Sequence, residues 1–227
     1  GKADFVFVSS RNLYEKCKRL NQKTHYLPNS ADFDHFHQAV SRDYSIPQDL
    51  ANLRRPIIGF YGALSNYKID FDLIAYLAQA KKDWSFVLIG QVGEGDPLTD
   101  TSGLNQANIH LLGSKAYQIL PQYLKYFDVC LLPNRINDYT KSMFPLKFFE
   151  YLSCGKPVVA TDLVSLREFK NYFYSSFSYE EFLENLEKAL SEDPQKKEER
   201  IELAKQFTWE KKIDEIPVVD NKRRPIG

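Results

Sequence analysis

A lysine and a glutamate three residues apart could bind a phosphorylated ligand together with its hydroxyl groups. Lys147 and Glu150 fall in a predicted helix, residues 146–153, that follows a polar loop carrying Lys141. Residues three apart share a similar face of a helix, and the first N–H groups of a helix attract anions. One interpretation places a diphosphate beside Lys147 and a diol on Glu150. The other is a solvated Lys–Glu pair, and spacing alone favours neither.

Glycines follow three consecutive predicted strands, which suggests a ligand cleft. Gly62, Gly90 and Gly113 end the predicted strands 57–61, 85–89 and 109–112. Glycine lets a backbone approach a ligand closely, and parallel sheets bind ligands at the carboxyl ends of their strands. A single glycine at such a position would only indicate a turn. Three at one edge of a sheet favour a binding site.

The elements that would position these residues alternate between short apolar strands and helices of about ten residues. Further strands are predicted at 5–8, 25–27, 129–132 and 157–160, and helices at 11–20, 70–82, 121–127, 178–190 and from 194 onward. This alternation predicts an α/β fold: a Rossmann-like parallel sheet with helices on both faces. Residues 31–54, which are polar and contain Pro47, read as an irregular connector.

The amino-acid composition argues against several classes of protein. The 227 residues carry 30 basic and 30 acidic side chains, so bulk attraction to nucleic acid or anionic lipid is not expected. Three scattered cysteines are too few for a disulfide framework or a zinc site, and they favour a reducing compartment. No apolar run approaches the roughly 20 residues of a membrane span. The chain starts without Met, directly before a strand, as a piece of a longer protein would.

Four stretches resemble motifs of the group 1 glycosyltransferases and follow one another along the chain in the same order as in that family. Members of that family are retaining enzymes with the two-domain GT-B fold. The four stretches are residues 108–133, residues 149–160 (FEYLSCGKPVVA), residues 27–36 (LPNSADFDHF) and residues 207–210 (FTWE). The resemblance implies the donor-binding, C-terminal half of such an enzyme. It divides the chain into a remnant of the acceptor domain (1–30), a connector (31–54), a nucleotide-sugar-binding domain (55–194), return helices (195–216) and a tail (217–227).

The resemblance also implies roles for individual residues. Glu150 matches a glutamate that contacts the ribose, whereas Ser142 and Ala63 stand where the family has a second glutamate and an arginine. Pro145 stands where glycine is usual, so one backbone donor is lost and Lys147 compensates. The implied nucleotide-sugar site comprises Gly62, Lys68, Gly90, Ser114, Lys115, Tyr117, Ser142, Phe144, Pro145, Leu146, Lys147 and Glu150.

The leading hypothesis is therefore donor binding for transfer of a sugar, with retention, from a UDP- or GDP-sugar to an acceptor hydroxyl in polysaccharide synthesis. Lys68 and Lys147 are the catalytic candidates, and neither a metal nor a cofactor is expected. The missing N-terminal domain would bind a glycan or lipid-linked acceptor. The expected location is cytoplasmic, with the full-length enzyme peripherally at the inner face of the membrane. The alternatives are a GT-B-type sugar-nucleotide epimerase and a non-catalytic nucleotide-binding module.

Two further groups of residues carry open interpretations. His110 alternates within an apolar strand, which favours a half-buried core position over an acid–base role in an epimerase. An aromatic-rich stretch could face a partner or a membrane, or pack onto the sheet. Its members are Phe169, Tyr172, Phe173, Tyr174, Phe177 and Tyr179.

Overall fold

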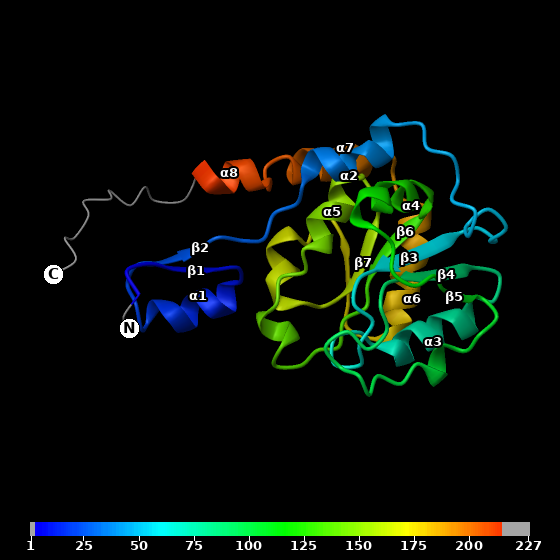
Figure 1. The fold of residues 1–227 in the computed structure, drawn as a ribbon, viewed down its shortest axis with the longest axis horizontal. Helices are drawn as coiled ribbons and strands as arrows, with labels where there is room; N and C mark the ends of the chain where they lie inside the picture. Colours follow the sequence, from blue (N-terminus) through cyan, green and yellow to red (C-terminus); the bar gives the residue numbers. More distant parts are fainter. Residues whose placement is uncertain (1–2, 215–227) are drawn as a thin grey trace.

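A six-stranded, wholly parallel sheet forms the body of the protein (Figure 1). The computed structural model describes residues 3–214. The strand order is β5-β4-β3-β6-β7-β8. The strands are β3 (Ile57–Tyr61), β4 (Ser85–Ile89), β5 (Ile109–Leu111), β6 (Val129–Leu132), β7 (Val158–Thr161) and β8 (Tyr174–Ser176). This confirms the predicted fold class.

Helices cover both faces of this sheet because its central strands are apolar on both sides. In β3, Ile57 and Tyr61 belong to one buried cluster, and Ile58 and Phe60 belong to another on the opposite face. Every residue of β3, β4 and β6 is buried, as expected for interior strands of a parallel sheet. The covering helices are α2 (Phe33–Ser41), α3 (Phe71–Ala80), α4 (Leu120–Tyr126), α5 (Lys147–Ser153), α6 (Tyr179–Leu190) and α7 (Gln195–Ala204).

Two helices begin at serine residues that the sequence predicts as N-caps. Ser10 accepts a hydrogen bond from the N–H of Leu13 and starts α1 (Arg11–Lys18). Ser178 accepts one from the N–H of Glu181 and starts α6. Each cap satisfies one N–H group that the helix itself leaves without a partner. Short 3-10 segments join other elements: η1 (Ser102–Leu104), η2 (Tyr117–Ile119), η3 (Thr140–Ser142) and η4 (Val164–Phe169).

The prediction of an irregular segment at residues 31–54 was wrong, because α2 lies within it. Asp32 caps this helix by accepting from the N–H of His35. Phe36 is fully buried, and α2 packs against both α4 and α5. Two of its polar residues also face inward, since His35 stacks on Tyr117 and His37 Nδ1 lies 3.0 Å from the Ser153 carbonyl oxygen. Whether this segment also connects two domains stays a prediction.

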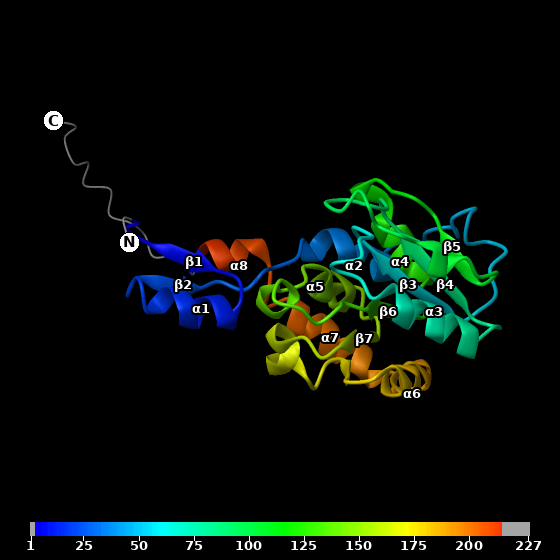
Figure 2. The same cartoon turned by 90° about the horizontal axis from the view of Figure 1, so that it is seen from below.

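A small unit at the N-terminus stands apart from the main sheet (Figures 1 and 2). Strands β1 (Val6–Val8) and β2 (Thr24–Tyr26) form a parallel pair joined through α1. At the other end of the described chain, α8 (Trp209–Asp214) extends from the main body toward this unit. This arrangement fits a domain remnant and a return helix, and those assignments stay predictions. The predicted tail and residues 215–216 lie outside the described residues.

A cleft at the carboxyl edge of the sheet

Two adjoining cavities lie where the central strands end. The first, of about 230 Å³, is lined by Tyr61, Gly62, Gly90, Ser114, Lys115 and Tyr117, among others. The second, of about 300 Å³, is lined by residues that include Lys68, Phe144, Pro145, Leu146 and Lys147. Ala63 lines both cavities. The cleft therefore gathers, from segments up to 85 residues apart, most of the residues that the sequence predicts for the site.

Lys147 lies across Gly62, at the junction of the two cavities. A Cβ atom placed on Gly62 would stand 2.1 Å from Cε and 2.6 Å from Nζ of Lys147. Gly62 also has a φ of +139°, which L side chains rarely adopt. The ammonium lies 5.9 Å and 5.8 Å from the ring centroids of Phe60 and Tyr61. Glycine at position 62 thus makes room for a cation between the cavities.

The second lysine of the cleft increases the positive charge there. Burial lowers the pKa of Lys147, Glu150 opposes this shift, and the charge of Lys68 adds to it. The pKa of Lys68 is raised, chiefly by its hydrogen bond with Tyr67. Two ammonium groups that repel each other favour an anion between them, because a shared counter-ion removes the repulsion.

Glu150 points back to the end of β3 and makes a hydrogen bond there. Its Oε2 accepts from the hydroxyl of Tyr61, a residue of the first cavity. Burial raises the pKa of Glu150, whereas the Tyr61 bond and the Lys147 charge oppose that rise. The sequence reasoning missed Tyr61, although its place between Gly59 and Gly62 at a strand end was a usable signal.

An aromatic stack borders the first cavity. The ring of His35, from α2, lies parallel to that of Tyr117 at 4.4 Å between centroids, and His35 Nε2 lies 3.0 Å from the Tyr117 carbonyl oxygen. Lys115 donates to Asp49 Oδ2 at 2.7 Å. His35 and Asp49 were not predicted, because both lie in the segment taken as irregular. They hold the turn that carries Ser114, Lys115 and Tyr117, three of the predicted site residues.

The loop before α5 differs from its expected form. The predicted helix start at Leu146 is one residue early, and α5 is only seven residues long. Phe144 is buried against Phe149, with 5.4 Å between ring centroids, so its side chain belongs to the core. A short helix has a weak dipole, and Pro145 offers no N–H. Lysine side chains therefore contribute more to an anion site here than the helix end does.

Two predicted residues, Glu150 and Ser142, line neither cavity: Glu150 binds the Tyr61 hydroxyl, and Ser142 is directed away from the cleft. The Oγ of Ser142 accepts a hydrogen bond of 2.8 Å from Asn12 of α1. Asn29 donates to the carbonyl oxygen of Phe144 at 2.9 Å. The N-terminal unit thus binds the loop that carries the site. Ser142 makes the contact with Asn12, and a contact between residues so far apart in the chain cannot be predicted from the residue type at position 142 alone.

Other candidate groups lie away from the cleft. His110 is half-buried in β5, as predicted, and burial lowers its pKa. It lines a separate cavity with Arg54 and Lys82. Among residues 3–214, no three His, Cys, Asp or Glu side chains gather as a metal site would require. Over the same range, no helix is both long and apolar enough to cross a bilayer.

Comparison with known proteins identifies the family. The profile of the glycosyl transferases group 1 family matches residues 55–192, which is more than half of the chain. The chain belongs to this family. It is 29% identical over 219 residues to TuaH of Bacillus subtilis (strain 168), named as a candidate glycosyltransferase of teichuronic acid biosynthesis. That match covers 92% of this chain and 54% of TuaH, so the chain spans about half the length of the curated relative.

Solved structures confirm the fold. HepE of Anabaena, in complex with UDP-glucose, superposes with a TM-score of 0.72 at 20% identity, covering 94% of this chain and 62% of HepE. WaaG, a glycosyltransferase involved in lipopolysaccharide biosynthesis, gives 0.63 at 16% identity, with coverage of 94% and 62%. These neighbours are GT-B glycosyltransferases, so this chain has the architecture of one half of that fold. Neither the family nor its relatives favour the epimerase or the non-catalytic module.

Proposed function

We propose that the cleft binds a nucleoside-diphosphate sugar, UDP- or GDP-linked, for transfer of the sugar with retention to an acceptor hydroxyl. The nucleoside would occupy the cavity beside Tyr117, and the sugar the cavity beside Lys68. The diphosphate would lie at their junction. The observation that carries this proposal is the position of Lys147 over Gly62, where a cation stands between a base-sized and a sugar-sized space.

Lys147 and Lys68 would act on the leaving group. Breaking the glycosidic bond leaves negative charge on the diphosphate, and preorganised cations stabilise that charge most strongly where water is excluded. Burial already disfavours the charged form of Lys147, so an adjacent diphosphate would raise its pKa again. We propose that these two lysines supply the stabilisation with no metal and no other cofactor. Glu150 would accept hydrogen bonds from the ribose hydroxyls.

The rest of the reaction belongs to the longer protein of which this chain would be a part. TuaH, HepE and WaaG all extend well beyond the region that this chain covers. The other half would bind a glycan or lipid-linked acceptor, in polysaccharide synthesis. We place the enzyme in the cytoplasm, at the inner face of the membrane. The unpaired thiols of Cys17, Cys130 and Cys154 support a reducing compartment.

Calorimetric titration with UDP and GDP tests the proposal. We expect one nucleotide to bind, and Lys147→Ala and Glu150→Ala each to weaken that binding at least tenfold. Lys170→Ala, an exposed lysine away from the cleft, is the matched control and should bind as the unmodified chain does. Unchanged affinity in both cleft variants would refute the site, and no binding of either nucleotide at millimolar concentration would refute the function.

A further inference from the structure

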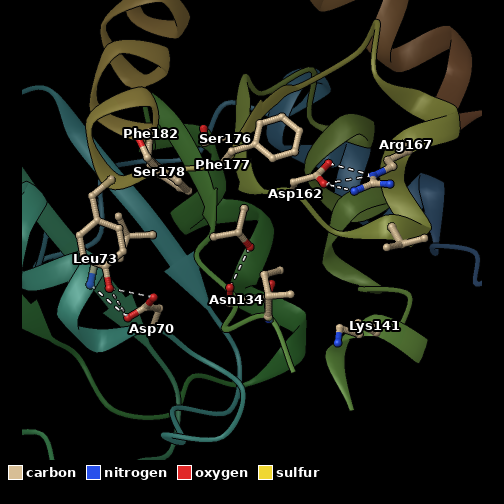
Figure 3. Close-up of a pocket in the computed structure, with 14 residues that line it drawn as sticks. Asp70, Leu73, Asn134, Lys141, Asp162, Arg167, Ser176, Phe177, Ser178 and Phe182 are labelled. Carbon is tan, nitrogen blue, oxygen red and sulfur yellow. Dashed lines mark hydrogen bonds and ion pairs between the residues drawn. The ribbon is translucent and has the colours of Figure 1, made fainter. Parts of the chain in front are cut away.

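A third cavity, larger than the two in the proposed donor cleft, lies further along the same edge of the sheet (Figure 3). Its volume is about 470 Å³, and it is formed where β6, β7 and β8 end and α6 begins. The donor proposal uses none of its polar groups. Asn134 lines this cavity and also the 300 Å³ cavity assigned to the donor sugar. The two spaces therefore share a wall.

The polar groups of the third cavity suit hydroxyl groups. The guanidinium of Arg167 pairs with Asp162, its Nε lying 3.1 Å from each carboxylate oxygen. Asn134 is only 5% exposed, and its Oδ1 has no hydrogen-bond partner among the described residues. That oxygen has almost no accessible surface, so the polar groups that a ligand in this cavity can reach are those of the Asp162–Arg167 pair. Carboxylate and guanidinium groups can each bind vicinal hydroxyls.

The charges around this cavity argue against a phosphorylated ligand. Asp70 and Asp162 balance Lys141 and Arg167 along its wall. Arg167 is committed to Asp162, and Lys141 lies 3.5 Å from Asp138. The first turn of α6 is acidic. This balance favours a neutral ligand that is rich in hydroxyl groups.

The rim supplies an apolar surface. Phe177, between β8 and α6, is 76% exposed, and its ring stands beside the Asp162–Arg167 pair (Figure 3). Ile136 and Val164 are 53% and 45% exposed. In the aromatic stretch 169–179, Phe169 and Phe173 pack into the core as predicted, whereas Phe177 does not. An aromatic face beside planar polar groups matches the apolar C–H face and hydroxyl edge of a sugar ring.

We propose that this cavity is a saccharide subsite that binds a neutral sugar unit of the acceptor chain. Its wall shared with the donor-sugar cavity would direct the acceptor toward the reacting carbon. The acceptor role rests on the proposed function, but saccharide binding itself does not. Phe177 provides the stacking surface, and Asp162 and Arg167 bind the hydroxyls.

NMR chemical-shift mapping of the ¹⁵N-labelled chain tests the subsite, with maltose, cellobiose and chitobiose as probes. We expect one of these to shift the amides of residues 161–162 and 176–179, whether or not UDP is present. Phe177→Ala should weaken that binding about tenfold, equivalent to ~1.4 kcal/mol. Leu20→Ala removes a side chain that is 78% exposed in the N-terminal unit and should leave the affinity unchanged.

Each contrary result has a defined meaning. The subsite is refuted if no probe shifts these amides, if UDP displaces the probe, or if Phe177→Ala binds like the unmodified chain. Loss of phosphatidylglycerol-vesicle binding in Phe177→Ala, with disaccharide binding intact, would assign the ring to a lipid surface instead and so overturn the proposal. Disaccharide binding without nucleotide binding would refute the donor function alone.

Discussion

Alanine at Gly62 would displace Lys147 while leaving the lysine in the chain. The new Cβ would stand 2.1 Å from Lys147 Cε, far closer than any real contact. The obstructing atoms are the end of a flexible side chain, so the lysine can move away. The φ of +139° at position 62 also strains the backbone of the variant, and circular dichroism must show that its fold persists. The ammonium would then leave the junction between the two cavities. Gly62→Ala and Lys147→Ala should therefore remove the same interaction with a bound diphosphate.

The size of the effect follows from the bond that is lost. A hydrogen bond to a charged group contributes about 1.5–3 kcal/mol. At about 1.4 kcal/mol per factor of ten, each single variant should weaken nucleotide binding roughly 10- to 150-fold. The double variant should lose little more than either single one. Summing the losses of the two single variants would count the same interaction twice. The coupling free energy between positions 62 and 147 should therefore equal that interaction, about 1.5–3 kcal/mol.

Calorimetric titration of all four proteins with the nucleotide that binds gives this coupling directly. Gly93→Ala is the matched glycine control, because Gly93 also has a positive φ, of +78°, and a Cβ there would meet no atom closer than 3.3 Å. It should bind as the unmodified chain does. Losses that add fully in the double variant would show that Gly62 and Lys147 act separately, and that Gly62 does not hold Lys147 at the diphosphate.

Three further predictions concern stability, each measured by urea unfolding. Burial raises the pKa of Glu150 above its ordinary 4.5, so its protonated form favours folding, and this contribution is lost as pH rises through the folded pKa. Glu150→Gln can still accept a hydrogen bond from Tyr61 and has no carboxylate to ionise. Its free energy of unfolding, relative to that of the unmodified chain, should therefore increase from pH 4 to pH 7. A difference that does not change with pH would contradict this. Arg200→Ala removes the ionic partner of Glu192, whose side chain is only 10% exposed, and should cost about 3–5 kcal/mol. A loss under 1 kcal/mol would contradict this. Phe36→Ala should cost about 3–5 kcal/mol because Phe36 is fully buried, and a loss under 1 kcal/mol would contradict the packing of α2 into the core.

The parts of the fold that local patterns encode could be predicted from the sequence. The apolar runs of β3 and β4 are buried on both faces, so each run alone indicates an interior strand. The Ser178 cap and the apolar spacing after it defined α6. Helix α2 escaped prediction because its nine residues are mostly polar and only Phe36 and Ala39 are buried. A short helix held by two buried side chains leaves little periodic signal.

The site was predictable where the motif is local and not where distant segments meet. Lys147 and Glu150 lie on one short helix, and their shared placement followed from spacing and resemblance. The bond between Glu150 and Tyr61 joins residues 89 apart. The bond between Asn12 and Ser142 joins residues 130 apart. Such pairings depend on how the strands are ordered in the sheet, which no local pattern specifies.

A structure of this chain with bound UDP or GDP would show whether Lys147 binds the diphosphate. We expect the diphosphate at the junction of the two cavities, within hydrogen-bond distance of Lys147 Nζ and close to Lys68. We also expect the ribose at Glu150 and the base beside Tyr117. A nucleotide bound in another cavity, or with its phosphates away from Lys147, would contradict this.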